Sequence, residues 1–252
     1  MDALNERAIR GAGTHESVWL PWLAEQRVHS ASMGELCPGQ ARLVVVAPHP
    51  DDEILACGGL LAMRAAHGLP SLVVAVTNGE ASHGTKDPQA CERLGQRRAQ
   101  ESGAGLKALG LAPACVVRLC IPDGKATNMI FAISMKLLPF LRPDDVIVTT
   151  WRLDGHPDHE ATAEAARQAA AKVGCRLLEA PVWMWHWATP DDLSIPWSRL
   201  VSIDLPRRVL VAKQQALSHH RSQLEPRGDG LDAVLVPSIL ARVARSREYF
   251  FN

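Results

Sequence analysis

The sequence predicts an α/β fold, a Rossmann-like and mostly parallel β-sheet that is flanked by helices on both faces. Short apolar runs rich in Val and Leu recur along residues 43–180, and segments of about ten or more residues with helical patterning separate them. This alternation is typical of βαβ units, which build parallel sheets. Right-handed crossovers between the strands would then place helices on both sides of the sheet.

The chain opens with a helix expected around Ser17–Arg27, followed by a loop rich in Ser, Gly and Pro. Regular alternation begins at Arg42. The first run, Leu43–Ala47, has no charged residue and stops at a Pro, which is typical of a strand buried on both faces. The expected elements are strand 43–47, helix 57–67, strand 71–77, helix 89–109, strand 115–119, helix 127–141, strand 145–150, helix 159–172 and strand 176–180.

A Trp-rich segment interrupts this rhythm after residue 181. Trp183, Trp185 and Trp187 alternate with other residues, and alternation favours an edge strand with one aromatic face on the core. Two alternatives stay open: an aromatic wall against a sugar or acyl chain, or burial against a second subunit. Beyond it we expect strand 199–203, helix 207–220 and a last helix over 231–246.

The length and the absence of repeats or low-complexity linkers favour one main domain. A chain of 252 residues suits a single α/β domain with a substantial core. We therefore expect a domain over 41–252, with residues 1–40 forming a leader that packs on it.

Composition excludes several classes of protein. The 27 basic and 27 acidic residues cancel, so no electrostatic footprint for nucleic acid is predicted. No apolar run approaches the roughly 20 residues that cross a bilayer, and no signal-peptide pattern opens the chain, so membrane insertion is not expected. The six Cys form no CxxC pair, which indicates a reduced, cytoplasmic protein.

Two of the predicted strands end in clusters of His and Asp. His49 and Asp52 follow the strand over 43–47, and His159 follows the strand over 145–150. Because parallel strands bring their carboxyl ends to one edge of a sheet, the clusters can converge on one crevice. Two imidazoles and one carboxylate make the three-ligand set, with open positions, of catalytic zinc.

The remaining polar residues of these clusters suggest acid–base roles. Asp51 could take a proton from a water molecule that a metal has activated. His156, if Asp158 holds it as imidazolium, could stabilise an oxyanion or protonate a leaving amine.

The paired motifs His49–Glu53 and His156–His159 resemble those of the PIG-L/LmbE-like family of zinc-dependent N-acetylglucosaminyl deacetylases. Further segments resemble the signatures of that family in the same order, and together they cover about residues 42–223. These segments are Thr77–Glu80, Arg98–Glu101, Pro122–Gly124, Lys213–Ala216, His220, Ser222 and Gln223.

The resemblance implies an enzyme that removes an N-acetyl group from an N-acetylglucosamine-type conjugate, giving acetate and a free amine. It implies one zinc per chain and a small-molecule amino-sugar conjugate as partner; a homo-oligomer is left open. The roles it implies are His49, Asp52 and His159 as zinc ligands, Asp51 as general base, His156 as oxyanion-stabilising or acid residue with Asp158 as its orienter, and Arg98 and Asp123 as holders of sugar hydroxyls.

Other interpretations of the chain remain. A hydrolase of the same fold could act on another N-acyl glycoside or a sugar–thiol conjugate. A non-enzymatic Rossmann-type nucleotide- or metal-binding module is disfavoured, because no glycine fingerprint is present and Asp51 would have no role.

Some of the named residues also have ordinary structural explanations. Asp158 could cap the next helix, Asp123 could serve a turn, and Arg98 could form a surface ion pair with Glu101. The Gly58-Gly59 pair favours close helix packing over a phosphate loop, and His220 could help to shape the site.

Overall fold

Eight strands form a single sheet in the computed structural model, which describes residues 7–26, 28–227 and 230–252. Their order across the sheet is β1-β7-β8-β6-β5-β2-β3-β4. The strands are β1 (His29–Ser30), β2 (Leu43–Ala47), β3 (Ser71–Ala75), β4 (Val116–Arg118), β5 (Val146–Thr150), β6 (Arg176–Ala180), β7 (Leu200–Asp204) and β8 (Arg247–Phe251).

The sheet is mostly parallel. β2 pairs in parallel with β3 and β5, and β4 and β6 extend this arrangement on either side. β1 is parallel to β7, whereas β8 runs antiparallel to both β6 and β7. The predicted α/β class is therefore confirmed.

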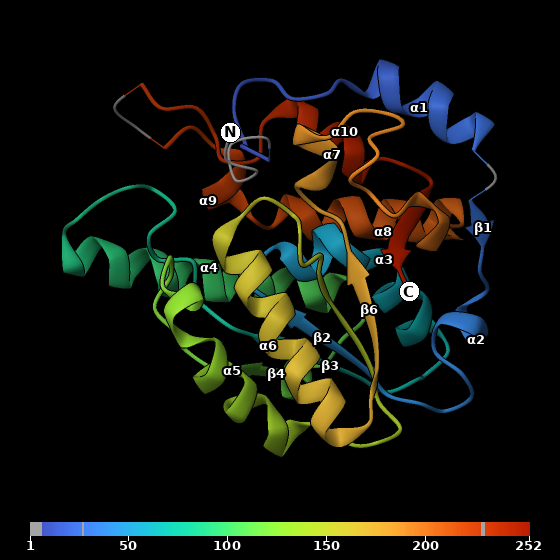
Figure 1. Cartoon of the computed structure of the whole chain (residues 1–252). Helices are drawn as coiled ribbons and strands as arrows, with labels where there is room; N and C mark the ends of the chain where they lie inside the picture. Colours follow the sequence, from blue (N-terminus) through green and yellow to red (C-terminus); the bar gives the residue numbers. More distant parts are fainter. Residues whose placement is uncertain (1–6, 27, 228–229) are drawn as a thin grey trace.

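Helices cover both faces of the sheet (Figure 1). α3, α4 and α8 pack together on one face, and α5 packs with α6 on the other. The helices are α1 (Glu16–Glu25), α2 (Met33–Leu36), α3 (Asp52–Ala66), α4 (Pro88–Ala108), α5 (Ile130–Leu137), α6 (Pro157–Val173), α7 (Met184–Trp187), α8 (Arg207–Ser218), α9 (Arg221–Leu224) and α10 (Pro237–Val243). Short 3₁₀ turns are η2 (Pro113–Cys115), η3 (Ala126–Met129), η4 (Leu138–Phe140) and η5 (Trp197–Arg199). No helix in the described part of the chain has the length and apolarity to cross a membrane.

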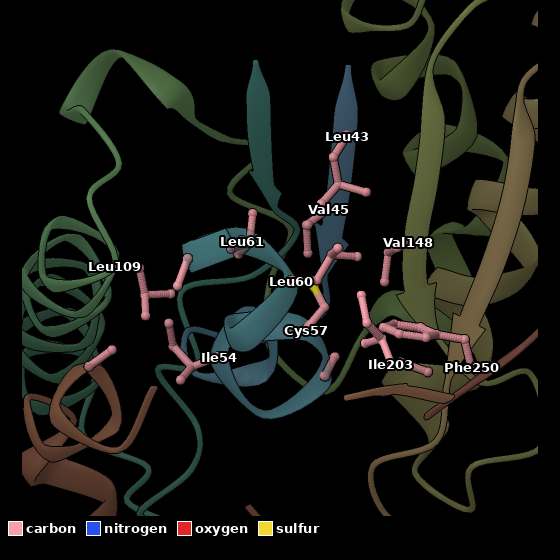
Figure 2. Packing of buried hydrophobic residues seen from close by; sticks show 14 of the residues in the cluster. Leu43, Val45, Ile54, Cys57, Leu60, Leu61, Leu109, Val148, Ile203 and Phe250 are labelled. Carbon is pink, nitrogen blue, oxygen red and sulfur yellow. The ribbon is translucent and has the colours of Figure 1, made fainter. Parts of the chain in front are cut away.

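Alternate residues of β2 face two separate cores. Leu43 and Val45 pack on the α3 side, whereas Val44 and Val46 pack on the side of α5 and α6. Figure 2 shows the first of these cores, with Leu60 of α3 close to β2. Because every residue of β2 is buried, the strand holds the loop that follows it in a fixed place.

α3 begins earlier than the predicted helix over 57–67 and bends within it. Cys57 has a φ of −150°, which is not helical. Beyond the bend, the amides of Gly59 and Leu60 donate to the carboxylate oxygens of Glu248, at 2.6 and 2.9 Å. Glu248 of β8 thus supplies the hydrogen bonds that the first amides of a helix segment lack.

A buried ion pair completes this bend. Lys213 of α8 donates from Nζ to Oε1 of Glu248 at 2.7 Å and to the backbone oxygen of Leu55 at 3.2 Å. A Cβ on Gly59 would lie 2.5 Å from Cδ2 of Leu205. The Gly pair therefore serves close packing.

The helix predicted over 231–246 is wrong in extent. The chain forms the shorter α10 and then β8, whose residues Tyr249, Phe250 and Phe251 are buried. β8 pairs mainly with β7, whose residues lie 43 to 51 positions before their partners in β8. The pattern of apolar residues within 231–246 contains no information about a strand partner so far away in the chain.

The edge strand predicted for the Trp-rich segment is also wrong, because residues 184–187 form α7. The indole of Trp185 donates to the backbone oxygen of Pro181 at 3.0 Å, and its ring meets that of Trp19 in α1 at 5.0 Å between centroids. α1 ends at Glu25, and the predicted helix end at Arg27 lies outside the described residues.

Candidate active site

The candidate site lies at the carboxyl ends of β2 and β5, the two adjacent strands from which the chain continues in opposite directions across the sheet. The chain proceeds from β2 toward β3 on one side, and from β5 toward β6 on the other. In open α/β sheets, ligands bind outside the carboxyl ends of the strands at such a switch point. The loops after β2 and β5 are the two segments whose His and Asp clusters the sequence predicts to converge.

His49, Asp52 and His159 meet at this edge. Nδ1 of His49 lies 3.1 Å from Oδ2 of Asp52, and Nε2 of His159 lies 3.2 Å from the same oxygen. All three side chains are buried. One carboxylate oxygen therefore faces two imidazole nitrogens.

This arrangement fits a metal ion. The three donor atoms all lie within 4.8 Å of one another. Zinc–ligand distances of about 2.0–2.2 Å place neighbouring tetrahedral ligands roughly 3.3 Å apart, close to the two separations found here. Two nitrogens and one oxygen also leave a coordination position open, as in catalytic zinc sites.

A second pair of carboxylates holds the other edge of the His49 ring. Nε2 of His49 lies 3.2 Å from Oδ1 of Asp123 and 3.4 Å from Oδ2 of Asp158. Asp123 also accepts a hydrogen bond from the amide of Ala81 at 2.9 Å. The two carboxylates thus orient His49, as acceptors behind a metal-ligating His commonly do.

Asp154, which is outside the residues predicted from the sequence to form the site, plays the corresponding part for His159. Its Oδ2 lies 2.8 Å from Nδ1 of His159. The same carboxylate accepts the amides of Val182, Trp183 and Met184 at 2.9–3.0 Å. A signal was present, because a ligating His needs an acceptor for its second ring nitrogen and Asp154 stands five residues before it.

Asp51 stands at the start of α3 in a strained conformation. Its φ of 139° is rarely adopted by a residue with a side chain, and its carboxylate makes no capping hydrogen bond to the helix. Oδ2 of Asp51 lies 3.2 Å from Nη2 of Arg98. Burial raises the pKa of Asp51 to about 7, although the charge of Arg98 opposes the shift. A carboxylate with this pKa suits a general base near neutral pH.

Arg98 is buried beneath Asp51 and is anchored to two loops. Its guanidinium donates to the backbone oxygens of Pro50 and Gly79, each at 2.9 Å. Gly79 has a φ of 65°, and a Cβ there would lie 1.9 Å from Nη1 of Arg98. The helix ion pair forms from Arg97 to Glu101 instead, at 2.9 Å.

His156 and Asp158 are neighbours, but not in the way the sequence suggests. The amide of Asp158 donates to Nδ1 of His156 at 3.2 Å, which makes His156 the N-cap of α6. The carboxylate of Asp158 accepts instead from the amides of Gly124 and Ala126, at 2.7 and 3.2 Å. Burial lowers the pKa of His156 to about 3, so its ring is neutral rather than the expected imidazolium.

A cavity of about 550 Å³ gives access to this cluster. Seven of the eight predicted site residues line it: His49, Asp51, Asp52, Arg98, Asp123, His156 and His159. Asp158 lies behind it, against the loop of Gly124. His220 is fully buried beside Gly105, and its ring nitrogens have no partner among the described residues.

Comparison with known proteins gives matches over the same part of the chain. Residues 44–170 match the family model described as PIG-L, GlcNAc-PI de-N-acetylase. The 1D-myo-inositol 2-acetamido-2-deoxy-alpha-D-glucopyranoside deacetylase of Rhodococcus jostii is 29% identical, over 84% of this chain and 91% of that protein. Deacetylase 1 of the same name from Saccharopolyspora erythraea is 30% identical, over 73% of this chain and 78% of that protein.

A solved structure shares the fold. The A40926 pseudoaglycone deacetylase Dbv21 aligns with a TM-score of 0.64 at 22% identity, over 84% of this chain and 97% of that chain.

Proposed function

Because this chain belongs to the PIG-L family of de-N-acetylases, we propose that it is a zinc-dependent hydrolase of an N-acetylglucosamine-type conjugate. The reaction hydrolyses the N-acetyl amide and gives acetate and a free amine. The family resemblance found in the sequence is confirmed. The names of the Rhodococcus and Saccharopolyspora relatives describe an amino sugar joined to inositol, which supports an amino-sugar conjugate as substrate.

One observation carries the proposal. A set of two nitrogens and one oxygen that fits a metal lies in the same cavity as Asp51, a buried carboxylate with a raised pKa. A structural metal site has no use for an adjacent base, whereas metal-assisted hydrolysis requires one. This juxtaposition favours an enzyme over a nucleotide- or metal-binding module.

The residues of the chain divide the chemistry between them. Zinc held by His49, Asp52 and His159 would supply a Lewis acid for the amide carbonyl. Asp51 takes the proton of the attacking water as the new C–O bond forms, and returns it to the amine nitrogen as the C–N bond breaks. Arg98 fixes the position of Asp51.

His156 acts as a hydrogen-bond donor in this scheme. Its Nδ1 accepts the amide of Asp158, so the proton of the neutral ring is on Nε2. That N–H can donate to the oxyanion that develops at the carbonyl. The imidazolium expected from the sequence is not needed for this role.

Arg98 and Asp123 differ as substrate contacts. The terminal nitrogens of Arg98 are engaged by Pro50, Gly79 and Asp51, so we assign it to positioning the base. Both residues line the cavity. The oxygens of Asp123 meet His49 and the amide of Ala81, but a carboxylate oxygen can accept more than one hydrogen bond, so we keep for Asp123 the proposed role of accepting a sugar hydroxyl.

The remaining assignments are proposals of the same kind. The donor set supports zinc as the resident metal, at one ion per chain. A cytoplasmic location is supported by the six cysteines, all of which are free thiols. The division into a leader over 1–40 and a domain over 41–252 stays a prediction.

The test is acetate release from purified protein, with and without a chelator. The substrates are free N-acetylglucosamine and its inositol-linked, malate-linked, chitobiose and nucleotide-sugar derivatives. Chelator-sensitive release from any of them supports the proposal. No release from a protein that holds about one zinc would point to another N-acyl substrate, and no release together with no bound metal would overturn the proposed function.

A further inference from the structure

Two chemically different groups of side chains are prominent in the lining of the catalytic cavity. One is the His and Asp cluster, and the other is a set of apolar side chains from distant segments. We call the set of Ile9, Trp183 and Leu235 the apolar wall. Ile9 comes from the N-terminal segment, Trp183 follows β6, and Leu235 precedes α10. None of these three positions belongs to a motif that the sequence analysis assigned to catalysis.

Trp183 differs from its two aromatic neighbours. The indole N–H of Trp185 donates to Pro181, and that of Trp187 donates to the backbone oxygen of Asp154 at 2.9 Å. The indole nitrogen of Trp183 has no hydrogen bond among the residues that the structure describes, and its ring is half-buried against the cavity. Trp185 and Trp187 therefore serve the fold, and Trp183 is available to a ligand.

The backbone fixes Trp183 relative to the metal cluster. Its amide donates to Oδ2 of Asp154 at 3.0 Å, the same oxygen that meets Nδ1 of His159. The ring is thus carried by a segment that shares one buried carboxylate with a metal ligand. A substrate whose amide reaches the cluster would have its remaining part at a set position along the wall.

Arg227 also lines the cavity, and like Arg98 it is bound to the protein itself. The guanidinium of Arg227 donates to the backbone oxygen of Asp232 at 2.7 Å and to that of Ser82 at 3.4 Å. It ties two loops together. An anionic group on the substrate would have to compete with these contacts.

Resting on the proposed function, we propose that the apolar wall binds the group attached to the amino sugar, and that this group is aromatic or alkyl. A polyol such as inositol would lose water from most of its hydroxyls against Ile9, Trp183 and Leu235, because the indole N–H of Trp183 is the one hydrogen-bonding group that these three side chains offer. An aryl ring instead packs on the indole of Trp183 and removes apolar surface from water. The inference concerns the attached group alone and leaves the sugar and the amide as proposed.

The experiment compares kcat/KM of the zinc-loaded enzyme for three substrates that share one amide. They are free N-acetylglucosamine, its 4-nitrophenyl glycoside and its inositol conjugate, each followed by acetate release. We expect the aryl glycoside to exceed both others by roughly tenfold or more, the discrimination that a filled apolar pocket supplies.

Trp183→Ala should lower the ratio of kcat/KM for the aryl glycoside to that for the free sugar by roughly tenfold or more. Trp183→Phe should retain a large part of the ratio, because it keeps an aromatic face. Trp197→Phe, a Trp exchange in the aromatic cluster away from the cavity, should leave the ratio unchanged. Zinc content and the thermal midpoint of each variant establish that it is folded and loaded.

Failure of this inference differs from failure of the proposed function. Equal or better turnover of the inositol conjugate, or an unchanged ratio in a folded Trp183→Ala, overturns the apolar wall as the binding site of the attached group. Hydrolysis of any of the three still upholds the deacetylase. If the zinc-loaded enzyme hydrolyses none of the three, the inference about the attached group is overturned, and the result points to another N-acyl substrate. The proposed function itself fails only if the protein also binds no metal.

Discussion

Two regions of the molecule contribute to the site in different ways. Residues 43–180 form the parallel βαβ part, and its strand ends carry the predicted metal and base cluster. The N-terminal segment and residues 181–252 add three strands, β1, β7 and β8, and the helices α1, α2, α7, α8, α9 and α10, and they carry the apolar wall. The first region positions the proposed metal ligands and base, and the second supplies the apolar surface proposed to contact the substrate.

The difference follows from how each region gains its structure. In the βαβ part, strands and helices follow one another along the chain, so a reactive loop stands directly after the strand that positions it. In the second region, contacts join segments more than a hundred residues apart, such as Trp19 and Trp185. Substitutions in the second region can thus alter the surface that faces the substrate, while the metal ligands and the base at the strand ends stay in place.

The largest effect is expected when the first region loses a metal ligand. His159→Ala should abolish metal binding and lower turnover beyond the roughly 10⁴-fold that a general base supplies at most. Metal analysis and acetate release measure the two effects. A His159→Ala enzyme that keeps stoichiometric zinc would show that the cluster is not the metal site.

Asp51→Asn provides the contrast within the same loop. The variant should keep its metal and lose activity by roughly 10²- to 10⁴-fold, because only the base is removed. The same two assays apply. If this variant and His159→Ala lose metal alike, base and ligand are not separate roles.

A third change tests whether the second region supports the first. Lys213→Met leaves the buried carboxylate of Glu248 without its cation at the bend of α3. Breaking a buried pair in this way should lower the free energy of unfolding by about 3–5 kcal/mol, which denaturant titration measures.

The matched control for Lys213→Met is Arg221→Met in the exposed pair with Glu225. Arg221→Met should lower the free energy of unfolding by less than about 1 kcal/mol. Equal costs for the two variants would argue against a supporting role of the buried pair.

Asp154 links the two regions, and its replacement should have a moderate effect. Asp154→Asn should weaken metal affinity by about 10- to 100-fold, the usual effect of losing an acceptor behind a ligating His. Competition with a chelator of known affinity measures it. An unchanged affinity would mean that His159 is oriented without this carboxylate.

The smallest effect is expected where the N-terminal segment meets α6. Arg7 pairs with Glu160 at 2.8 Å near the protein surface. Arg7→Ala should change the free energy of unfolding by about 0–1 kcal/mol, because such pairs contribute little. A loss of several kcal/mol in denaturant titration would show that the segment is integral to the domain.

Sequence patterns were most informative where structure is local. The strand at Leu43–Ala47 forms as predicted, and His49, Asp52 and His159 come together because neighbouring parallel strands end at one edge. What escaped prediction depends on partners far away in the chain. β8 requires β7, and the role of Asp154 requires the amides of residues 182–184.

The Trp-rich segment shows the same limit within five residues. Alternation along 183–187 resembles that of a strand, yet residues 184–187 form a helix. The indole of Trp185 donates to the backbone oxygen of Pro181 nearby, and that of Trp187 donates to the backbone oxygen of Asp154 in a distant loop. Trp183 lines the catalytic cavity together with Ile9 and Leu235, and no spacing within the segment reports on residues so remote.

The shared carboxylate of Asp154 has a consequence for protein engineering. Because it accepts the amides of Val182, Trp183 and Met184 as well as facing His159, the loop after β6 cannot be exchanged as an independent cassette. A grafted loop that fails to present those three amides would leave the acceptor mispositioned. Specificity transplants in this scaffold should therefore move Asp154 and the loop as one unit.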